Sequence, residues 1–256
     1  MIDKIIVTGC SYSTGIEMID NDQKIFYLTL KDRRSYIWKW YKENYPTESK
    51  GLSIEQVDKL SNQKFHDLER EHSWPALVEK ETGIPVINLS VIGASIGRTL
   101  IEFSNYCKDN KVSDQTVAIH QLPFFGRFYM RFLDHRTNVL PRDFDEDFEI
   151  LGYDKKYFKK DIEKLKNNYR QIIKKDLTSN YIEKHYYSCL KRIKRISEKN
   201  QIKSFFITQK DMELENVIIK DFEVFKEKYK KGSGGHPIDP NFNKDLVDII
   251  KTRLSV

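Results

Sequence analysis

The sequence predicts a three-layer α/β sandwich built on a parallel, flavodoxin-like central sheet of about five strands. Short, nearly continuous apolar runs alternate along the chain with longer segments in which apolar residues recur at helical spacing. Strands that are covered by helices on both faces of a parallel sheet are apolar throughout, as these runs are. The length of 256 residues fits one such domain with insertions, so we expect a single domain over 1–256.

Five apolar runs are predicted to be strands, and turn residues bound most of them. The first ends at Gly9, and the third ends at Leu122-Pro123. The predicted strands are residues 4–8, 85–89, 116–121, 203–208 and 217–219.

Helical patterns lie between and after these strands. The first of them stops at Gly83, a residue that commonly ends helices, and the last begins near Pro240. The predicted helices are residues 74–82, 98–110, 155–175, 179–199 and 240–254.

Two segments are too long to be ordinary connections. Residues 16–72 separate the first strand from the first helix, and residues 123–154 follow the third strand and are rich in aromatic residues and arginine. Connections of this length in a compact domain are usually lids or substrate walls. We therefore expect two functional insertions.

The net charge of +6 is concentrated in a basic helical region, residues 155–199, which holds 15 Lys and Arg against 5 Asp and Glu. Such a region could contact a polyanion, or it could simply be a solvated helix face. No motif that interleaves aromatic and basic residues for RNA binding accompanies it, so nucleic acid is not an expected partner.

Three features of the sequence predict the location of the protein. No run approaches 18 uninterrupted apolar residues, so no membrane span is expected, and the first residues do not resemble a signal peptide. Cys10, Cys107 and Cys189 form neither an even set nor a close cluster, as is typical of free thiols in a reducing compartment. We therefore expect a cytoplasmic protein.

Ser11 is the first candidate for chemistry. It follows Gly9 at the carboxyl end of the first strand, the edge at which open α/β sheets bind ligands. Backbone N–H groups at a strand-to-helix turn can also hold an oxyanion. The alternative is that Ser11 or Ser13 only caps the following helix.

The spacing from Gly9 to Gly15, with no lysine after it, excludes a Walker phosphate loop. Ile16 occupies the position where a cysteine phosphatase loop that began at Cys10 would need arginine.

Two later segments are expected to reach the same site. The second strand leads through Asn88 to Gly93 and Ser95, and a glycine there lets backbone N–H groups approach a substrate closely. His236, in a glycine-rich loop ahead of the last helix, could act as a general base for a serine. The histidines show no metal-site spacing, so neither a metal nor an organic cofactor is expected.

Together these segments resemble the SGNH hydrolases, also called GDSL-type esterases. The resemblance rests on Gly-x-Ser after the first strand, on Asn-Leu-Ser-x-x-Gly-x-Ser in mid-chain and on His-Pro before the last helix, and it covers 1–15, 73–122 and 232–256. It implies that Ser11 is the nucleophile, Gly93 an oxyanion donor and His236 the general base. It also implies a three-layer fold and the hydrolysis or transfer of acyl groups.

The sequence departs from the pattern of this family at three positions. Cys10 replaces the usual aspartate, and Gln121-Leu122-Pro123-Phe124 stands where the family has Gly-x-Asn-Asp. Gln121 is therefore a candidate replacement for the missing asparagine. Ser233 occupies the position of the triad aspartate, so the site is a Ser–His dyad, borrows a carboxylate such as Asp239, or has lost hydrolysis.

We accordingly expect a serine-dependent esterase whose substrate is a small-molecule or carbohydrate ester. The aromatic insertion would suit the removal of an acyl group from a carbohydrate, because aromatic rings pack on sugar faces. Asn88, Gln121 and Ser95 are expected to bind substrate or its oxyanion beside Gly93. The alternatives are an O-acyltransferase acting on a glycan and a non-catalytic binding protein with the same fold.

Overall fold

A computed structural model of the chain describes most of its residues. Backbone and side chains are described throughout except as follows. Residues 10–12, 14–29, 92–93, 124–127, 133–134, 140–178, 210–211 and 230–238 are not described. For 30–34, 66, 128–132, 135–139, 179–182 and 240, only the backbone is described.

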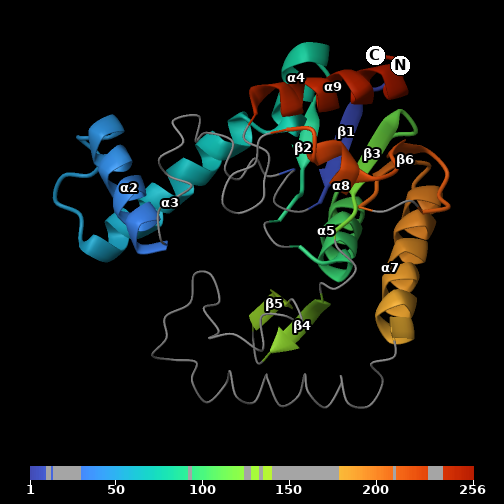
Figure 1. The fold of residues 1–256 in the computed structure, drawn as a ribbon, viewed down its shortest axis with the longest axis horizontal. Coiled ribbons are helices and arrows are strands. Elements are labelled where there is room, and N and C mark those ends of the chain that lie inside the picture. Colours follow the sequence, from blue (N-terminus) through green and yellow to red (C-terminus); the bar gives the residue numbers. More distant parts are fainter. Residues whose placement is uncertain are drawn as a thin grey trace.

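The centre of the molecule is a five-stranded parallel sheet in the order β2-β1-β3-β6-β7 (Figure 1). Strand β1 lies between β2 and β3, with Ile5 opposite Val86 on one side and opposite Val117 on the other. The predicted flavodoxin-like α/β fold is thereby confirmed. The strands are β1 (Lys4–Thr8), β2 (Val86–Asn88), β3 (Thr116–Gln121), β6 (Lys203–Ile207) and β7 (Val217–Ile219).

Helices cover both faces of this sheet and complete three layers. Alternate strand residues face opposite sides, so Ile5 and Val7 join one core and Ile6 joins the other. The first face packs against α4 (Trp74–Thr82), α8 (Phe222–Lys226) and α9 (Pro240–Leu254). The second face packs against α5 (Ile96–Asp109) and α7 (Ser179–Lys199).

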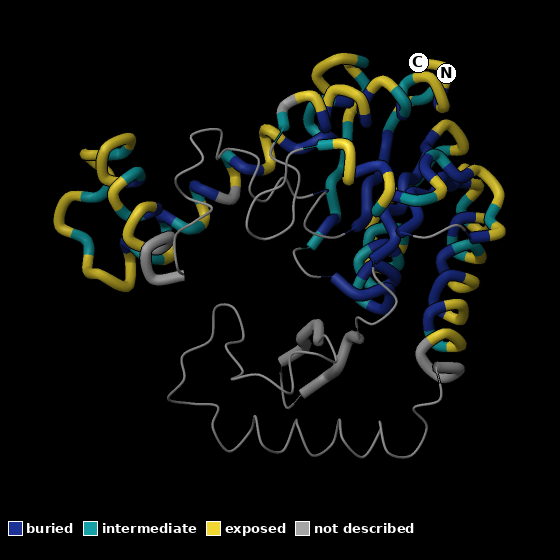
Figure 2. Tube along the Cα trace, in the orientation of Figure 1, coloured by how far each residue is buried: buried dark blue, intermediate teal, exposed yellow. Residues whose placement is uncertain are grey.

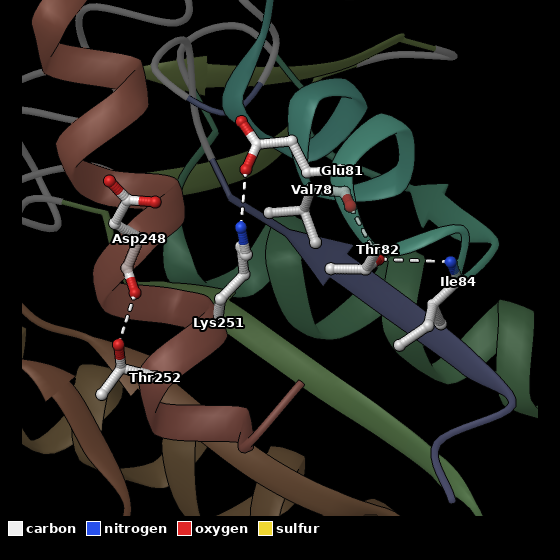
Figure 3. Close-up of polar contacts among 7 residues, drawn as sticks. All are labelled: Val78, Glu81, Thr82, Ile84, Asp248, Lys251 and Thr252. Atoms are coloured by element: carbon white, nitrogen blue, oxygen red, sulfur yellow. Dashed lines mark hydrogen bonds and ion pairs between the residues drawn. The ribbon is translucent and has the colours of Figure 1, made fainter.

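The ends of α4 and α9 follow from local sequence. Gly83 ends α4 with a φ of 69°, a left-handed conformation that glycine adopts without strain. Asp239 caps α9, its carboxylate accepting a hydrogen bond from the backbone N–H of Asn241. The two helices lie side by side, and Lys251 Nζ donates to Glu81 Oε2 at 2.8 Å (Figure 3).

Helix α9 runs against the direction of the strands. Its last residue, Leu254, lines a hollow together with Ile2, Gly83 and Gln115. Ile2 and Gln115 lie just before β1 and β3, and Gly83 lies at the end of α4. The start of α9, with Asp239, therefore lies toward the carboxyl ends of the strands. An Asn243 Nδ2–His72 O hydrogen bond of 2.7 Å fixes this start against the α3–α4 junction.

Within the insertion predicted over 16–72, the structure describes two helices that were not predicted, α2 (Leu30–Asn44) and α3 (Ile54–Glu71). The pair extends to one side of the sheet (Figure 1), and its outer surface is mostly exposed (Figure 2). It has a small core of its own, made by Ile37, Tyr41, Val57 and Phe65. The sequence analysis did not identify these helices, although α3 carries apolar residues at helical spacing.

The other differences from the predicted elements are small. Strand β2 is shorter than predicted, α5 begins at Ile96 rather than 98, and the short α8 was not predicted. The insertion at 123–154 contains an antiparallel pair, β4 (Phe128–Phe132) and β5 (His135–Val139). The predicted helix 155–175 lies outside the described residues.

In the part of the chain that the structure describes, no helix combines the length and the apolar character needed to cross a membrane.

Candidate active site

The strand order defines one place where a ligand site is expected. The chain passes from β1 to β2 on one side and then crosses back to β3 on the other, so the connections diverge between the carboxyl ends of β1 and β3. Open α/β sheets bind ligands in the crevice at such a topological switch point. Gly9 and Gln121 stand at this point, at the ends of the two strands.

A buried hydrogen bond crosses the switch point. The Oγ of Ser13 donates to Oε1 of Gln121, and both side chains are fully buried. Gly9 makes this contact possible, because a Cβ on residue 9 would lie 2.6 Å from Ser13 Oγ and 2.9 Å from Gln121 Cβ. A glycine is therefore required here by close packing.

Asn88, at the end of β2, holds the neighbouring backbone. Its Nδ2 donates to the carbonyl oxygen of Ser13 at 2.7 Å, and its Oδ1 accepts from the N–H of Ser90 at 3.1 Å. The N–H of Val91 also donates to the carbonyl oxygen of Gly9 at 3.2 Å. The chain after β2 is thus tied to the chain after β1, beside the switch point.

Three buried atoms at this edge have no hydrogen-bond partner among the described residues. They are Ser90 Oγ after β2, Gln121 Nε2 at the end of β3 and Gln209 Oε1 after β6. The Nε2 of Gln209 is used, since it donates to the carbonyl oxygen of Leu122 at 3.0 Å. Most buried polar groups in proteins are paired, so these three atoms mark the sheet edge as a place where a further polar partner is expected.

The remaining predicted site residues are distributed as follows. Ser11, Gly93 and His236 lie outside the described residues. Ser95 is buried, and its Oγ accepts from the N–H of Arg98 at 3.3 Å as the N-cap of α5. Asp239 uses one carboxylate oxygen as the N-cap of α9. Asn88, Ser13 and Gln121 are thus brought together by direct contact, whereas Ser95 and Asp239 serve as helix caps.

A second polar cluster lies on the opposite face of the sheet, and its hydrogen bonds form one consistent chain. Ser197 Oγ donates to the carbonyl oxygen of Ile193 at 3.0 Å, so it must accept from Ser204 Oγ at 2.7 Å. Ser204 then accepts from Nε2 of His120 at 3.2 Å, and Nδ1 of His120 accepts from Thr8 Oγ1 at 2.8 Å. Every polar atom in the chain is used, with His120 as the neutral Nε2–H tautomer.

Burial also sets the charge state of His120. The ring is fully buried, with its face stacked on Phe206 and its edge against Phe103. Desolvation lowers the pKa of His120 to about 3, because the charged imidazolium would lose its hydration. His120 is therefore a neutral core residue rather than a general base at neutral pH.

The described cysteines are poor nucleophiles. Burial raises the pKa of Cys107 to about 11 and also raises the pKa of Cys189, so both remain thiols at neutral pH. Within the described ranges, no group of three or more His, Cys, Asp and Glu side chains is arranged to hold a metal ion.

Sequence reasoning missed three residues of this edge: Ser13 as a site residue, Ser90 and Gln209. Ser90 and Gln209 each lie two residues beyond the end of a strand, a position that can be read once strands are assigned. The sequence alone suggests for Ser13 only the role of a helix cap. Its partner on β3 is 108 positions away, and nothing in the local sequence indicates that pairing.

Comparison with known proteins gives no further assignment: no protein-family model matches this chain, and no curated protein is similar to it in sequence.

Proposed function

We propose that the protein is a serine-dependent esterase of the SGNH type. The observation that carries the proposal is the polar sheet edge at the switch point, which begins two residues before Ser11. Hydrogen-bonding atoms of Ser90 and Gln121 remain unpaired there among the described residues. A site that must hold a carbonyl oxygen and its developing negative charge needs unpaired donors of this kind.

In the proposed reaction, Ser11 Oγ attacks the carbonyl carbon of an ester while His236 takes the hydroxyl proton. The carbonyl oxygen becomes negative and is held by the N–H groups of Ser11 and Gly93 and by Nε2 of Gln121. The tetrahedral intermediate then collapses, and His236 returns the proton to the departing alcohol. Water hydrolyses the acyl-enzyme by the same steps, which releases the acid and restores Ser11.

The substrate class that we propose is a small ester or an acylated carbohydrate. If a sugar hydroxyl rather than water attacks the acyl-enzyme, the same residues perform O-acyl transfer to a glycan. We propose a cytoplasmic location, where Cys107 and Cys189 would stay reduced.

The direct test is labelling with a fluorophosphonate, which reacts with activated serines. The wild type is expected to be labelled and to hydrolyse p-nitrophenyl acetate, whereas Ser11→Ala and His236→Ala are expected to do neither. Ser61→Ala is a suitable control, because Ser61 lies in α3, away from the sheet edge, where its side chain is fully buried. A wild type that is neither labelled nor active would remove the esterase and leave the non-catalytic binding protein.

The role of Asp239 can be tested without losing its cap. Serine is as good an N-cap as aspartate, so Asp239→Ser keeps the start of α9 while removing the carboxylate. If Asp239 orients His236, kcat of Asp239→Ser should fall by about 10³-fold or more, as in triad enzymes that lose their acid. An unchanged kcat would assign the site to a Ser–His dyad.

A second proposal concerns polyanions and rests on the exposed side of α7. The exposed basic residues of this helix are Lys184, Lys191, Arg192, Arg195 and Lys199. Changing all five to Gln should shorten the retention of the protein on heparin, with a smaller difference at high salt. Equal retention of the two proteins would show that this face is only solvated.

A further inference from the structure

Gln121 can act as a hydrogen-bond donor only if its side-chain amide is held in one orientation. An amide that rotated freely about its last bond would present its oxygen to a negative ligand atom as readily as its nitrogen. The oxygen would repel an oxyanion, whereas the two N–H groups would stabilise it. The role of Gln121 as a donor therefore depends on what holds its amide in one orientation.

One contact holds the amide of Gln121 in the orientation that the structure shows. Ser13 Oγ, a hydroxyl with a single proton, donates to Oε1 of Gln121, so the amide oxygen is used and, among the described residues, Nε2 keeps both protons free. Both residues are fully buried, and no other described residue bonds to that nitrogen. In this arrangement the hydroxyl engages the oxygen of the amide, which leaves the nitrogen as the end available to a ligand.

Two neighbouring residues hold Ser13 in place for this contact. Asn88 Nδ2 binds the Ser13 carbonyl oxygen at 2.7 Å, which ties its backbone to the end of β2. Gly9 leaves the space that the Ser13 side chain occupies. Residues that follow or end three adjacent strands therefore help to place one amide group, whose nitrogen has no hydrogen-bond partner among the described residues.

We propose that Ser13 is a positioning residue, which orients the amide of Gln121 so that Nε2 donates to the carbonyl oxygen of the substrate as it becomes negative. This inference rests on the proposed esterase function. It adds to that function a residue that does not touch substrate and acts only through Gln121.

The test compares variants by kcat, KM and the rate of fluorophosphonate labelling. Loss of an oxyanion donor typically lowers kcat by about 10²-fold to 10³-fold, so Gln121→Ala should lose about that much with little change in KM. Ser13→Ala should lose less, about 10-fold, because the amide would still spend part of its time correctly oriented. In the Gln121→Ala background, Ser13→Ala should have almost no further effect on kcat.

Gln121→Met separates a donor from a merely structural partner. Methionine has a similar length and fills a similar space at this fully buried position, but it offers no N–H group. Its kcat should therefore fall about as far as that of Gln121→Ala. If Gln121 only packs the edge, Gln121→Met should retain activity close to wild type, and the inference would be wrong.

The controls separate this inference from the esterase proposal. Thermal unfolding should show every variant folded, and Ser61→Ala should keep wild-type kcat. If the wild type is labelled but Ser13→Ala matches Ser61→Ala, or if the effects of Ser13→Ala and Gln121→Ala on the free energy of activation simply add, the role of Ser13 is overturned while the esterase stands. If the wild type itself is unlabelled, both proposals fail.

Discussion

Two buried polar clusters at the ends of β1 and β3 differ in one respect that separates a core from a site. On the α5–α7 face, the chain from Thr8 through His120 to Ser197 uses every donor and acceptor. On the α4–α9 face, the Ser13–Gln121 pair leaves both protons of Gln121 Nε2 free among the described residues. Burial alone does not distinguish the two clusters, but hydrogen-bond satisfaction does.

The largest expected effect is on the cluster of Thr8, His120, Ser204 and Ser197, whose polar atoms are all paired. His120→Asn removes an aromatic ring packed between Phe103 and Phe206 and breaks the bonds to Thr8 and Ser204. The cavity and the unpaired hydroxyls should lower the free energy of unfolding by about 3–5 kcal/mol. Urea unfolding measures this loss, and a loss below about 1 kcal/mol would show that the cluster does not stabilise the core.

Gly9→Ala should instead disrupt the Ser13–Gln121 pair, in which Gln121 Nε2 has no partner among the described residues. The new methyl group must displace Ser13 Oγ or Gln121, because it would lie under 3 Å from both. We expect the rate of fluorophosphonate labelling to fall by about 10²-fold, comparable to the loss of an oxyanion donor.

The matched control is Gly51→Ala in the turn before α3. Gly51 has a φ of 79°, and no neighbouring atom lies within 4 Å of the position that an alanine Cβ would take, so the substitution strains the backbone without disturbing packing. It should cost about 1 kcal/mol of stability and leave labelling unchanged. Equal labelling of both glycine variants would contradict the packing argument at Gly9.

A change of pH is expected to alter stability through the same histidine, His120. The pKa of His120 is lowered to about 3 in the folded protein, so between about pH 3 and its ordinary value of 6.5 the unfolded chain binds one more proton than the folded one. The contribution of His120 to stability is therefore complete above about pH 6.5 and is lost as the pH falls, by about 1.4 kcal/mol per pH unit. Urea unfolding from pH 7 to pH 4 should show this slope in the wild type and a flatter one in His120→Asn. Parallel slopes would exclude His120 as the source.

The smallest expected effect is that of Ser197→Ala, at the far end of the satisfied chain. Ser204 would lose its acceptor, and the carbonyl oxygen of Ile193 would lose a second donor. The cost should be about 1 kcal/mol of stability, with labelling unchanged. A slower labelling rate would mean that the two clusters are coupled through β1 and β3.

The elements that were predicted correctly are those with local signals. Gly83 stops α4 and Pro240 starts α9, and both ends fall where expected. Helices α2 and α3 were missed, although Val57, Leu60 and Phe65 of α3 recur at helical spacing. The capping box of Ser53 and Gln56 at the start of α3 was the available signal.

The residues of the candidate site also differ in whether the sequence could reveal them. Asn88 and Gln121 were selected through the resemblance to the SGNH hydrolases, and both end parallel strands, whose carboxyl ends meet at one edge. The contact of Ser13 with Gln121 depends on the register of β1 and β3, with Thr8 opposite His120. A long-range pairing of this kind is set by tertiary structure, so residue type and local spacing could not reveal it.

The position of β1 in the sheet also has a consequence for how the chain folds. This strand is central, but its neighbours come from much later in the sequence, with Ile5 opposite Val86 and opposite Val117. The sheet cannot close around β1 until both later strands have formed, and contacts between such distant segments slow folding. During synthesis on the ribosome, the apolar Ile5-Ile6-Val7 run therefore has no native strand partner until β2 has emerged and is paired on both sides only after β3 has emerged, so it is exposed to non-native contacts in the interval.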